Sequence, residues 1–205
     1  GNMVTPKYYS QAGQDAWVCE LFNFKRNGFF VDIGAYDGVK FSNSYTLEQQ
    51  FGWKGICVEA NAQTFKELCK VRSSQNINTA VTDRNGMCVF IEDDMYGRIV
   101  FDNEIIKISK PCPSKTIGTI LSECNAPAII DYLSLDIEGG EFIALSVFPF
   151  DKYKIRALTV EHNFYNSGPG NKNKIYDILT EAGYTRVKEV SADGLHFEDW
   201  YTKNI

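Results

Sequence analysis

The sequence lacks the short patterns that mark several common ligand sites. No G-x-x-x-x-G-K-[ST] segment occurs, so a P-loop is excluded. The six cysteines are widely spaced and include no C-x-x-C pair, which fits neither a zinc site nor a small disulfide-rich scaffold. Several of them lie in apolar, strand-like runs. We therefore expect buried thiols in a protein of a reducing compartment.

Long apolar runs and an excess of positive charge are also missing. No run approaches the roughly 20 apolar residues of a membrane-spanning helix, and no signal-peptide pattern opens the chain. The 21 Lys and Arg residues are outnumbered by 26 Asp and Glu, so the net charge is −5. An acidic chain disfavours a nucleic-acid surface. We expect no nucleic-acid partner, no membrane association and a cytoplasmic location.

Strand-like apolar runs alternate with helical patterns along most of the chain. The strand-like runs cover residues 29–33, 55–59, 78–82, 129–137 and 155–160. The helical patterns cover residues 45–51, 62–71, 117–124, 140–147 and 174–182, and a further one begins near Asp15. This alternation predicts an α/β fold with a mostly parallel sheet and helices on both faces.

Residues 87–114 and the C-terminal part of the chain do not follow this alternation. Residues 184–190 and 195–201 predict an antiparallel C-terminal hairpin, and residues 87–91 alternate like an edge strand. Residues 92–114 are charged, contain two prolines and predict an insertion with a hairpin or loop. A chain of 205 residues, 44% of them hydrophobic, fits one domain over residues 1–205, with residues 1–9 as an N-terminal tail.

The stretch FFVDIGAYDG, residues 29–38, has two interpretations. In one, an apolar strand ends at Gly34 and Gly38, whose missing side chains let the backbone approach a ligand. In the other, Asp37-Gly38 is the turn of a β-hairpin. The stretch alone does not decide between them.

Acidic residues close four of the predicted strands, and they favour the ligand-binding turn. These residues are Asp32, Glu59, Asp136 and Glu161. Ligands of open α/β sheets bind beyond the carboxyl ends of the strands, and a buried acid needs a partner or a ligand. The turn has only two glycines, so the dinucleotide pattern G-x-G-x-x-G is incomplete, and its acids would repel a pyrophosphate. A positively charged ligand fits better, and Glu59 is suited to a ribose diol.

Three runs resemble the FkbM family of S-adenosylmethionine-dependent methyltransferases: FFVDIGAYDGVKFSNSYTLEQQFGWKGICVEAN, IDYLSLDIEGGEF and ALTVEHN. The segment SQAGQD also resembles one that often precedes the first strand in a branch of that family. The resemblance covers most of residues 10–165 and is weak for 92–114 and for the C-terminal hairpin. It implies a Rossmann-like class I methyltransferase fold with a mostly parallel seven-stranded sheet, and S-adenosylmethionine as the cofactor.

The resemblance also implies roles for single residues. The glycine turn, which holds the methionine part of the cofactor, corresponds to Asp32, Gly34, Ala35, Tyr36 and Gly38. The ribose acid corresponds to Glu59, with Ala60 and Asn61 after it, and the adenine is bordered by Thr82 and Asp83. The DxEGxE segment beside the reacting centre corresponds to Asp136, Ile137, Glu138, Gly139 and Glu141. Ser42 and Asn43 either donate to the cofactor carboxylate or cap a helix.

The family mostly methylates hydroxyl groups, often on sugars, so the resemblance implies an O-methyltransferase with a sugar or glycan acceptor. A protonated hydroxyl needs a base or a metal ion. Related sugar O-methyltransferases hold a divalent ion at acids closing the fourth and fifth strands, and Asp136, Glu161 and His162 match that placement. Mg²⁺ or Mn²⁺ would suit these ligands. A metal-free alternative uses His162 as the base, oriented by Asp136 or Glu161, and in a third interpretation His162 only packs.

Other interpretations stay open from the sequence. The chain could be a catalytically silent cofactor-binding or interaction module, or could methylate a non-sugar small molecule. Methylation of nucleic-acid bases is disfavoured, because Asp136 begins an acidic segment in place of the proline–aromatic motif used for amino groups of bases. Phe164, Tyr165 and the loop 166–173 are the candidates for the acceptor wall. The protein is expected to be a monomer or a homodimer.

Overall fold

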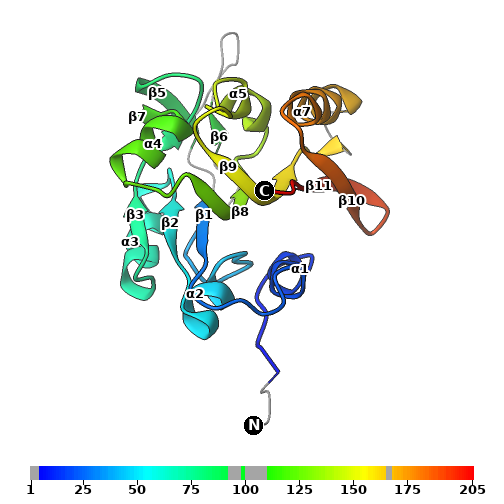
Figure 1. The fold of residues 1–205 in the computed structure, drawn as a ribbon. Helices are drawn as coiled ribbons and strands as arrows, with labels where there is room; N and C mark the ends of the chain where they lie inside the picture. Colours follow the sequence, from blue (N-terminus) through cyan, green and yellow to red (C-terminus); the bar gives the residue numbers. More distant parts are fainter. Residues whose placement is uncertain (1–4, 92–97, 100–109, 165–167) are drawn as a thin grey trace.

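The computed structural model describes residues 5–91, 98–99, 110–164 and 168–205 (Figure 1). Its main sheet has seven strands in the order β10-β11-β9-β8-β1-β2-β3. The five parallel strands are β1 (Phe29–Ile33), β2 (Lys54–Val58), β3 (Gln75–Ile77), β8 (Ile129–Leu135) and β9 (Lys154–Glu161). The hairpin of β10 (Thr185–Ala192) and β11 (Leu195–Thr202) completes the sheet, with β11 antiparallel to β9. The predicted α/β fold, with its mostly parallel sheet and antiparallel hairpin, is confirmed.

Helices cover both faces of this sheet (Figure 1). One face carries α1 (Gln14–Leu21), α2 (Tyr45–Phe51) and α3 (Ala62–Val71), and the other carries α4 (Ile117–Glu123), α5 (Glu141–Ser146) and α7 (Pro169–Glu181). Successive side chains of a strand point to opposite faces, so Phe30 of β1 packs with the first set and its neighbour Val31 with the second. Burial on both faces explains why β1 is almost continuously apolar. No helix in the described ranges is long and apolar enough to cross a membrane.

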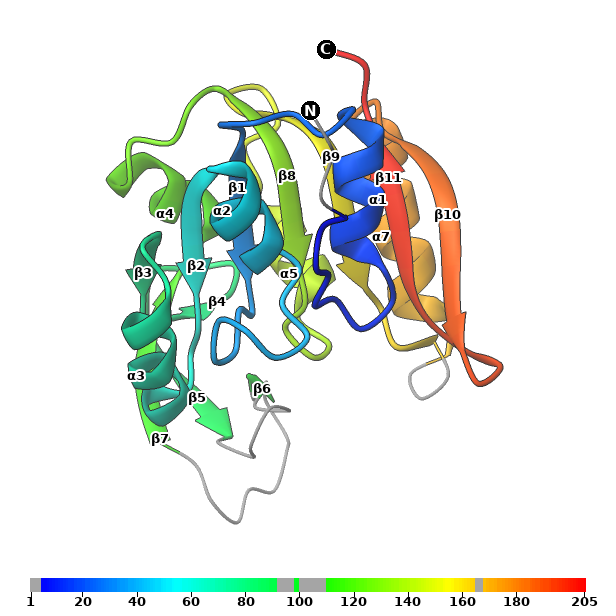
Figure 2. The same cartoon turned by 90° about the horizontal axis from the view of Figure 1, so that it is seen from below.

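A second, four-stranded sheet lies on the side of the molecule where β3 forms the edge of the main sheet (Figures 1 and 2). Its order is β4-β7-β5-β6, with β4 (Ala80–Val81), β5 (Gly86–Ile91), β6 (Arg98–Ile99) and β7 (Lys110–Lys115). Of the predicted strand 78–82, only residues 80–81 form a strand, and it belongs to the second sheet, because the main sheet ends at β3. Residues 110–114 of the predicted insertion are strand, and 92–97 and 100–109 lie outside the described residues.

The last helix also differs from its prediction. Helix α7 begins at Pro169, so most of the predicted loop 166–173 is helical, while residues 165–167 lie outside the described residues. Proline suits the first helical position, because its missing N–H would have no partner there. Along the chain, α7 therefore begins sooner after β9 than the sequence predicted.

Candidate functional site

A cleft of about 290 Å³ opens at the carboxyl ends of β1, β2, β8 and β9. It lies where the chain order of the sheet reverses, since β1 has β2 on one side and β8 on the other. Four further segments line the cleft: Gln11 and Gln14 at the start of α1, residues 40–43 ahead of α2, residues 79–81, and the tip of the β10–β11 hairpin with the first part of β11. The cleft therefore has one half near β1 and β2 and another near the hairpin.

The turn after β1 brings the backbone close to the end of β8. Gly34 has φ 89°, and a Cβ atom there would lie 1.9 Å from the carbonyl oxygen of Asp136. Gly38 has φ 87°, and its Cβ would lie 2.7 Å from Cγ of Arg72. Because β1 pairs in parallel with both β2 and β8, the hairpin interpretation of this stretch is wrong. Glycine is required at both positions because a Cβ atom would overlap with neighbouring atoms, and not because the chain must be flexible there.

Asp32 lines the cleft from the buried end of β1. The hydroxyl of Ser44 donates to its Oδ2 at 2.6 Å, and Nη2 of Arg72 donates to that hydroxyl at 2.9 Å. Burial raises the pKa of Asp32, and Ser44 and Arg72 oppose this rise. Arg72 also donates to the carbonyl of Gly38 at 3.1 Å and to Glu48 at 3.0 Å, so it ties the turn to α2. Arg72 is not predictable from the sequence, because nothing in its neighbourhood along the chain marks it.

Glu59 follows β2 and is fixed by two backbone N–H groups. Its Oε1 accepts from Tyr36 at 2.9 Å and its Oε2 accepts from Asn61 at 2.8 Å. A carboxylate oxygen has a second acceptor position, so both oxygens can still bind a diol. Burial raises the pKa of Glu59. Ala60 lines the cleft beside it, whereas Asn61 does not and instead caps α3 by accepting from Thr64 N at 2.8 Å.

The wall beyond Glu59 is made by residues 79–81 and not by Thr82 and Asp83. Thr82 is buried, and its hydroxyl bonds to that of Ser114 in β7. Asp83 pairs with Arg84 at 3.0 Å away from the cleft. The chain passes here from the main sheet to the second sheet. The residues that contact the cleft are therefore nearer to β3 than Thr82 and Asp83 are. The sequence prediction placed this contact too late along the chain.

Ser42 and Asn43 both line the cleft, and each also has a structural role. The hydroxyl of Ser42 accepts from the backbone N–H groups of Ser44 at 3.2 Å and Tyr45 at 3.0 Å, so it caps the start of α2. Asn43 donates to the Ser134 hydroxyl at 2.9 Å, and its Oδ1 is buried without a hydrogen bond to any described residue. Asn43 therefore has an acceptor that a ligand could satisfy.

Three carboxylates converge at the ends of β8 and β9. Asp136, Glu138 and Glu161 each offer an oxygen, and these atoms lie within 4.8 Å of one another. Asn163 donates to Oε2 of Glu138 at 3.2 Å and to Oε1 of Glu161 at 2.9 Å. The Oδ1 atom of Asp136 is buried and has no hydrogen-bond partner in the described part of the chain. Burial, with the nearby charges, raises the pKa of Glu138 to about 7 and that of Glu161 well above its usual value.

A fourth acid, Glu141, supports this cluster from behind. It is fully buried and does not line the cleft. Its carboxylate accepts from the N–H of Ile137 at 2.8 Å and of Gly139 at 3.1 Å, which fixes the turn that presents Glu138. Burial and the charge of Asp136 raise the pKa of Glu141 to about 8. Asp136, Ile137 and Glu138 of the predicted DxEGxE segment thus line the cleft, and Glu141 positions them from behind.

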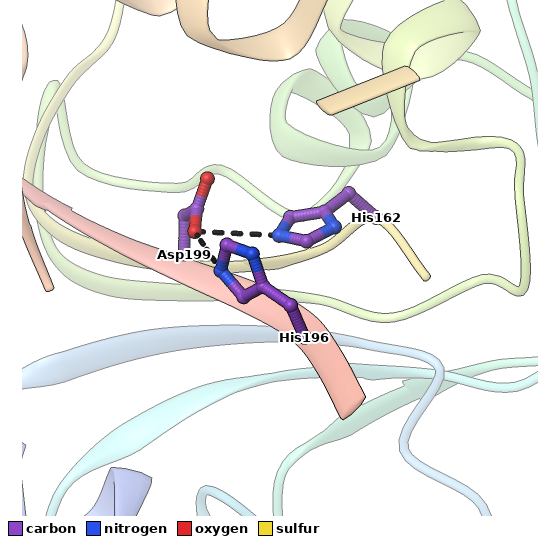
Figure 3. A group of neighbouring side chains, drawn as sticks. All are labelled: His162, His196 and Asp199. Atoms are coloured by element: carbon purple, nitrogen blue, oxygen red, sulfur yellow. Dashed lines mark hydrogen bonds and ion pairs between the residues drawn. The ribbon is translucent and has the colours of Figure 1, made fainter. Parts of the chain in front are cut away.

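His162 lies apart from this cluster, so the structure brings Asp136 and Glu161 of the predicted set together without His162. His162 follows Glu161 directly in extended chain, and adjacent side chains of such a chain point to opposite faces. Its Nε2 lies 3.3 Å from Oδ1 of Asp199, and Nε2 of His196 lies 3.1 Å from the same oxygen (Figure 3). His162 is not among the residues that line the cleft.

The His162, His196 and Asp199 group has the composition of a metal site, but its hydrogen bonds indicate otherwise. The backbone N–H of Phe164 donates to Nδ1 of His162 at 3.1 Å, so in the neutral ring Nε2 carries the proton. A protonated ring nitrogen has no lone pair for a metal ion. Lys172 Nζ also lies 3.0 Å from Nδ1 of His196 and adds a positive charge. The group therefore joins the end of β9, β11 and α7 through close polar contacts.

The hairpin side of the cleft contains an acid that the sequence analysis missed. Glu198 of β11 lies opposite Glu161 in the register, lines the cleft and is 3% exposed. Its Oε2 accepts from Nε2 of Gln14 and from Nε1 of Trp200, each at 2.7 Å. Burial raises the pKa of Glu198 to about 7. Only the strand pairing identifies this residue, since no motif surrounds it in the sequence.

The predicted acceptor wall is only partly within the described residues. Phe164 stacks near the ring of His196, with centroids 5.8 Å apart, and does not line the cleft. Tyr165 and residues 166–167 lie outside the described part. The apolar side chains on the hairpin half are instead Phe41, Leu195 and Phe197, and the first two are exposed.

Comparison with known proteins agrees with this architecture. A family model described as "Methyltransferase FkbM domain" matches residues 32–186. No curated protein matches the sequence. The METTL16 MTase domain has a TM-score of 0.55 at 11% identity over 92% of this chain and 65% of its own length, so this chain spans just under two thirds of it.

Two further solved structures have a similar fold. Magnesium protoporphyrin IX methyltransferase (ChlM) from Synechocystis PCC 6803, with bound SAM, has a TM-score of 0.52 at 12% identity over 93% of this chain and 76% of its own. A TehB-like SAM-dependent methyltransferase from Corynebacterium glutamicum has a TM-score of 0.51 at 8% identity over 97% and 89%. At such identities the similarity shows the fold alone.

Proposed function

Because the chain belongs to the FkbM methyltransferase family, we propose that it is an S-adenosylmethionine-dependent O-methyltransferase acting on a hydroxyl group of a sugar or glycan. One observation carries the proposal: a glycine turn suited to the cofactor and a cluster of three carboxylates share one cleft. An activated methyl donor leaves two tasks to the protein, which are to position the acceptor and to remove its proton. We also propose that residues 1–205 act as one domain.

The half of the cleft near β1 and β2 suits the cofactor. Asp32 offers a negative charge near the turn at Gly34, which fits the cationic amino-acid end of S-adenosylmethionine. Glu59 is fixed through two backbone N–H groups and keeps acceptor positions for the ribose hydroxyls. Ala60 and residues 79–81 offer a flat, mostly apolar wall for the adenine.

The carboxylate cluster fits a divalent cation. Asp136 Oδ1 is a buried acceptor without a hydrogen-bond partner among the described residues, and Glu138 and Glu161 place two more hard oxygen donors beside it. Such a set of ligands suits Mg²⁺ or Mn²⁺. A divalent cation there supplies positive charge that eases deprotonation of an acceptor hydroxyl.

The remaining contribution comes from side chains around the cluster. Asn163 holds Glu138 and Glu161 in fixed orientations through its two N–H donations. Glu198, clamped by Gln14 and Trp200, presents a carboxylate on the hairpin side of the cleft. Its Oε1 makes no hydrogen bond with the described residues and can accept one from the acceptor. The acceptor then lies between the hairpin and the cluster.

A methyl-transfer assay over a panel of free sugars, glycans and non-sugar small molecules, read by mass, tests the proposal. We expect transfer to a sugar hydroxyl, its loss in EDTA and its return with added Mn²⁺ or Mg²⁺. Glu161→Gln should lower turnover at least about 100-fold, the low end of the effect of an acid–base group. Calorimetry should show nearly unchanged affinity of this variant for S-adenosylmethionine. Asp83→Asn, which removes an acid outside the cleft, is the matched control and should retain activity.

Other outcomes would change specific parts of the proposal. Methylation of non-sugar compounds alone would overturn the acceptor class. Cofactor binding without transfer to any acceptor would favour a silent module. Full activity in EDTA would overturn the proposal of a metal ion. Tight binding of NAD in place of S-adenosylmethionine would overturn the proposed cofactor.

A further inference from the structure

Two cysteines far from the carboxylate cluster lie side by side in the second sheet. Cys88 of β5 and Cys112 of β7 are direct partners in the antiparallel register, although they are 24 residues apart in the sequence. Their Sγ atoms are 3.2 Å apart, and both residues are partly exposed. The wide spacing in the sequence gave no sign of this contact.

The type of this strand pair decides whether the two residues can be linked. Pro111 and Pro113 flank Cys112 and have no N–H to donate to β5, so the hydrogen-bonded pair must be the one at Cys88 and Cys112. Such a pair has a Cα separation of about 5.5 Å, inside the roughly 4.4–6.8 Å range of disulfides. Cross-strand Cβ atoms lie about 4.5–5.5 Å apart and disulfides need about 3.5–4.5 Å, so a link would draw β5 and β7 together by about 1 Å.

The Cys88 thiol also differs from the buried thiols of Cys19 and Cys57. The hydrogen bond with Cys112 lowers the pKa of Cys88, and burial opposes this effect only in part. Burial instead raises the pKa of both Cys19 and Cys57 to about 12. A thiolate is the attacking species in exchange with a disulfide, so Cys88 is the reactive member of the pair.

The pair is packed directly behind the cofactor half of the cleft. Ala80 is buried against Ala60, Cys88 and Cys112. Ala60 and Ala80 line the cleft next to Glu59. The hydroxyl of Thr79, another lining residue, donates to the carbonyl of Pro113 at 3.1 Å. A shift of β7 relative to β5 is therefore transmitted to the wall at residues 79–81.

We propose that Cys88 and Cys112 form a reversible disulfide through exchange with a low-molecular-weight disulfide, and that this link lowers the affinity of the cleft for S-adenosylmethionine. The Cys88 thiolate attacks the small disulfide and releases one thiol as the leaving group. The Cys112 thiolate then attacks the Cys88 sulfur of the mixed disulfide and releases the second. Two electrons pass from the two cysteines to the small disulfide, and the protons lost by the cysteines remain on the two thiols released. The effect on affinity rests on the proposed cofactor, whereas formation of the link does not.

Oxidised glutathione is the probe for the first part of the proposal. The reduced full chain is incubated with it, denatured with an alkylating agent and analysed by intact mass and peptide mapping. We expect four of the six cysteines to be alkylated, with a linked peptide joining residues 88 and 112, and full reversal by dithiothreitol. Cys112→Ser should leave a glutathione adduct on Cys88 and no internal link. Cys69→Ser, which removes an exposed thiol elsewhere, should still form the link.

Calorimetry on the linked and reduced protein tests the second part. The dissociation constant of S-adenosylmethionine should rise roughly tenfold on linking, within the range typical of coupled sites. By reciprocity, saturating cofactor should disfavour the link by the same factor in a glutathione redox buffer. Six alkylated cysteines, or a link between other cysteines, would overturn the disulfide. Equal affinity in both forms would overturn its coupling to the cleft, and no binding to either form would instead count against the proposed cofactor.

Discussion

Replacing Gly34 by alanine should damage the protein far more than the change of one hydrogen suggests. At φ 89° the left-handed backbone conformation lowers the free energy of unfolding of an alanine variant by roughly 1–2 kcal/mol. Its Cβ would also lie 1.9 Å from the Asp136 carbonyl oxygen, and these atoms cannot approach closer than 3.0 Å. The Cβ is held rigidly by the backbone of residue 34 and the Asp136 oxygen is itself backbone, so β8 must retreat from β1, at a further cost of roughly 1–3 kcal/mol. A displacement of this size beside the reacting groups lowers turnover by about 100-fold.

Gly13→Ala is the matched control for this prediction. Gly13 has φ 83°, but no atom lies within 4 Å of its Cβ position, so its substitution pays the conformational cost alone. Urea unfolding of both variants, followed by tryptophan fluorescence, measures the difference in the free energy of unfolding. Calorimetric titration with S-adenosylmethionine measures the effect on the cleft. Equal stabilities within about 0.5 kcal/mol and wild-type affinity for Gly34→Ala would refute the requirement for close approach.

Three further predictions concern charge in and near the cleft. A folded-state pKa of about 7 for Glu198 means that its contribution to stability is full below pH 4.5 and is lost as the pH rises through 7. In urea unfolding, the free energy of unfolding of Glu198→Gln should therefore rise relative to that of wild type by about 2–4 kcal/mol as the pH increases from 4.5 to 8. A difference that does not depend on pH would contradict the burial argument. Mn²⁺ should raise the melting temperature clearly at pH 8 and little at pH 5, because Glu138, with a pKa of about 7, is protonated at the lower pH. Glu161→Gln should remove this shift, and a shift that survives would locate the ion elsewhere. His162→Asn should cost about 1–3 kcal/mol of stability, as expected for a lost buried hydrogen bond, with turnover of the folded protein within about threefold of wild type. A loss of turnover of 100-fold or more would indicate that His162 takes part in the reaction.

The main sheet was predictable because its information is local. Four of the apolar runs, at residues 29–33, 55–59, 129–137 and 155–160, form parallel strands of this sheet, and the carboxyl ends of parallel strands meet at one edge. That geometry alone brings Asp32, Glu59, Asp136 and Glu161 to one cleft. The same reasoning failed at His162, because strand-end position was counted and the alternation of side chains was not. Residues that are adjacent in an extended chain cannot both face one site.

Apart from β5, which the alternation at residues 87–91 indicated, the second sheet was not predictable from local sequence, and neither were two of the site residues. Strands of two or three residues, such as β4 and β3, are too short to show a period. Arg72 reaches the turn at Gly38 from 34 residues away, and Glu198 meets Gln14 across 184 residues. Interactions of this range depend on the finished fold, so no spacing rule reveals them.

The strand order at the hairpin end has a consequence for how the cleft is assembled in time. Strand β10 precedes β11 in the chain, yet in the sheet it pairs only with β11, which in turn pairs with β9. During synthesis β10 therefore has no place in the sheet until β11 has left the ribosome, and the two must join as a preformed pair. Glu198 and the hairpin tip arrive with that last step. The half of the cleft that we propose for the cofactor, built by residues up to Glu161, can form before the wall that we propose for the acceptor exists.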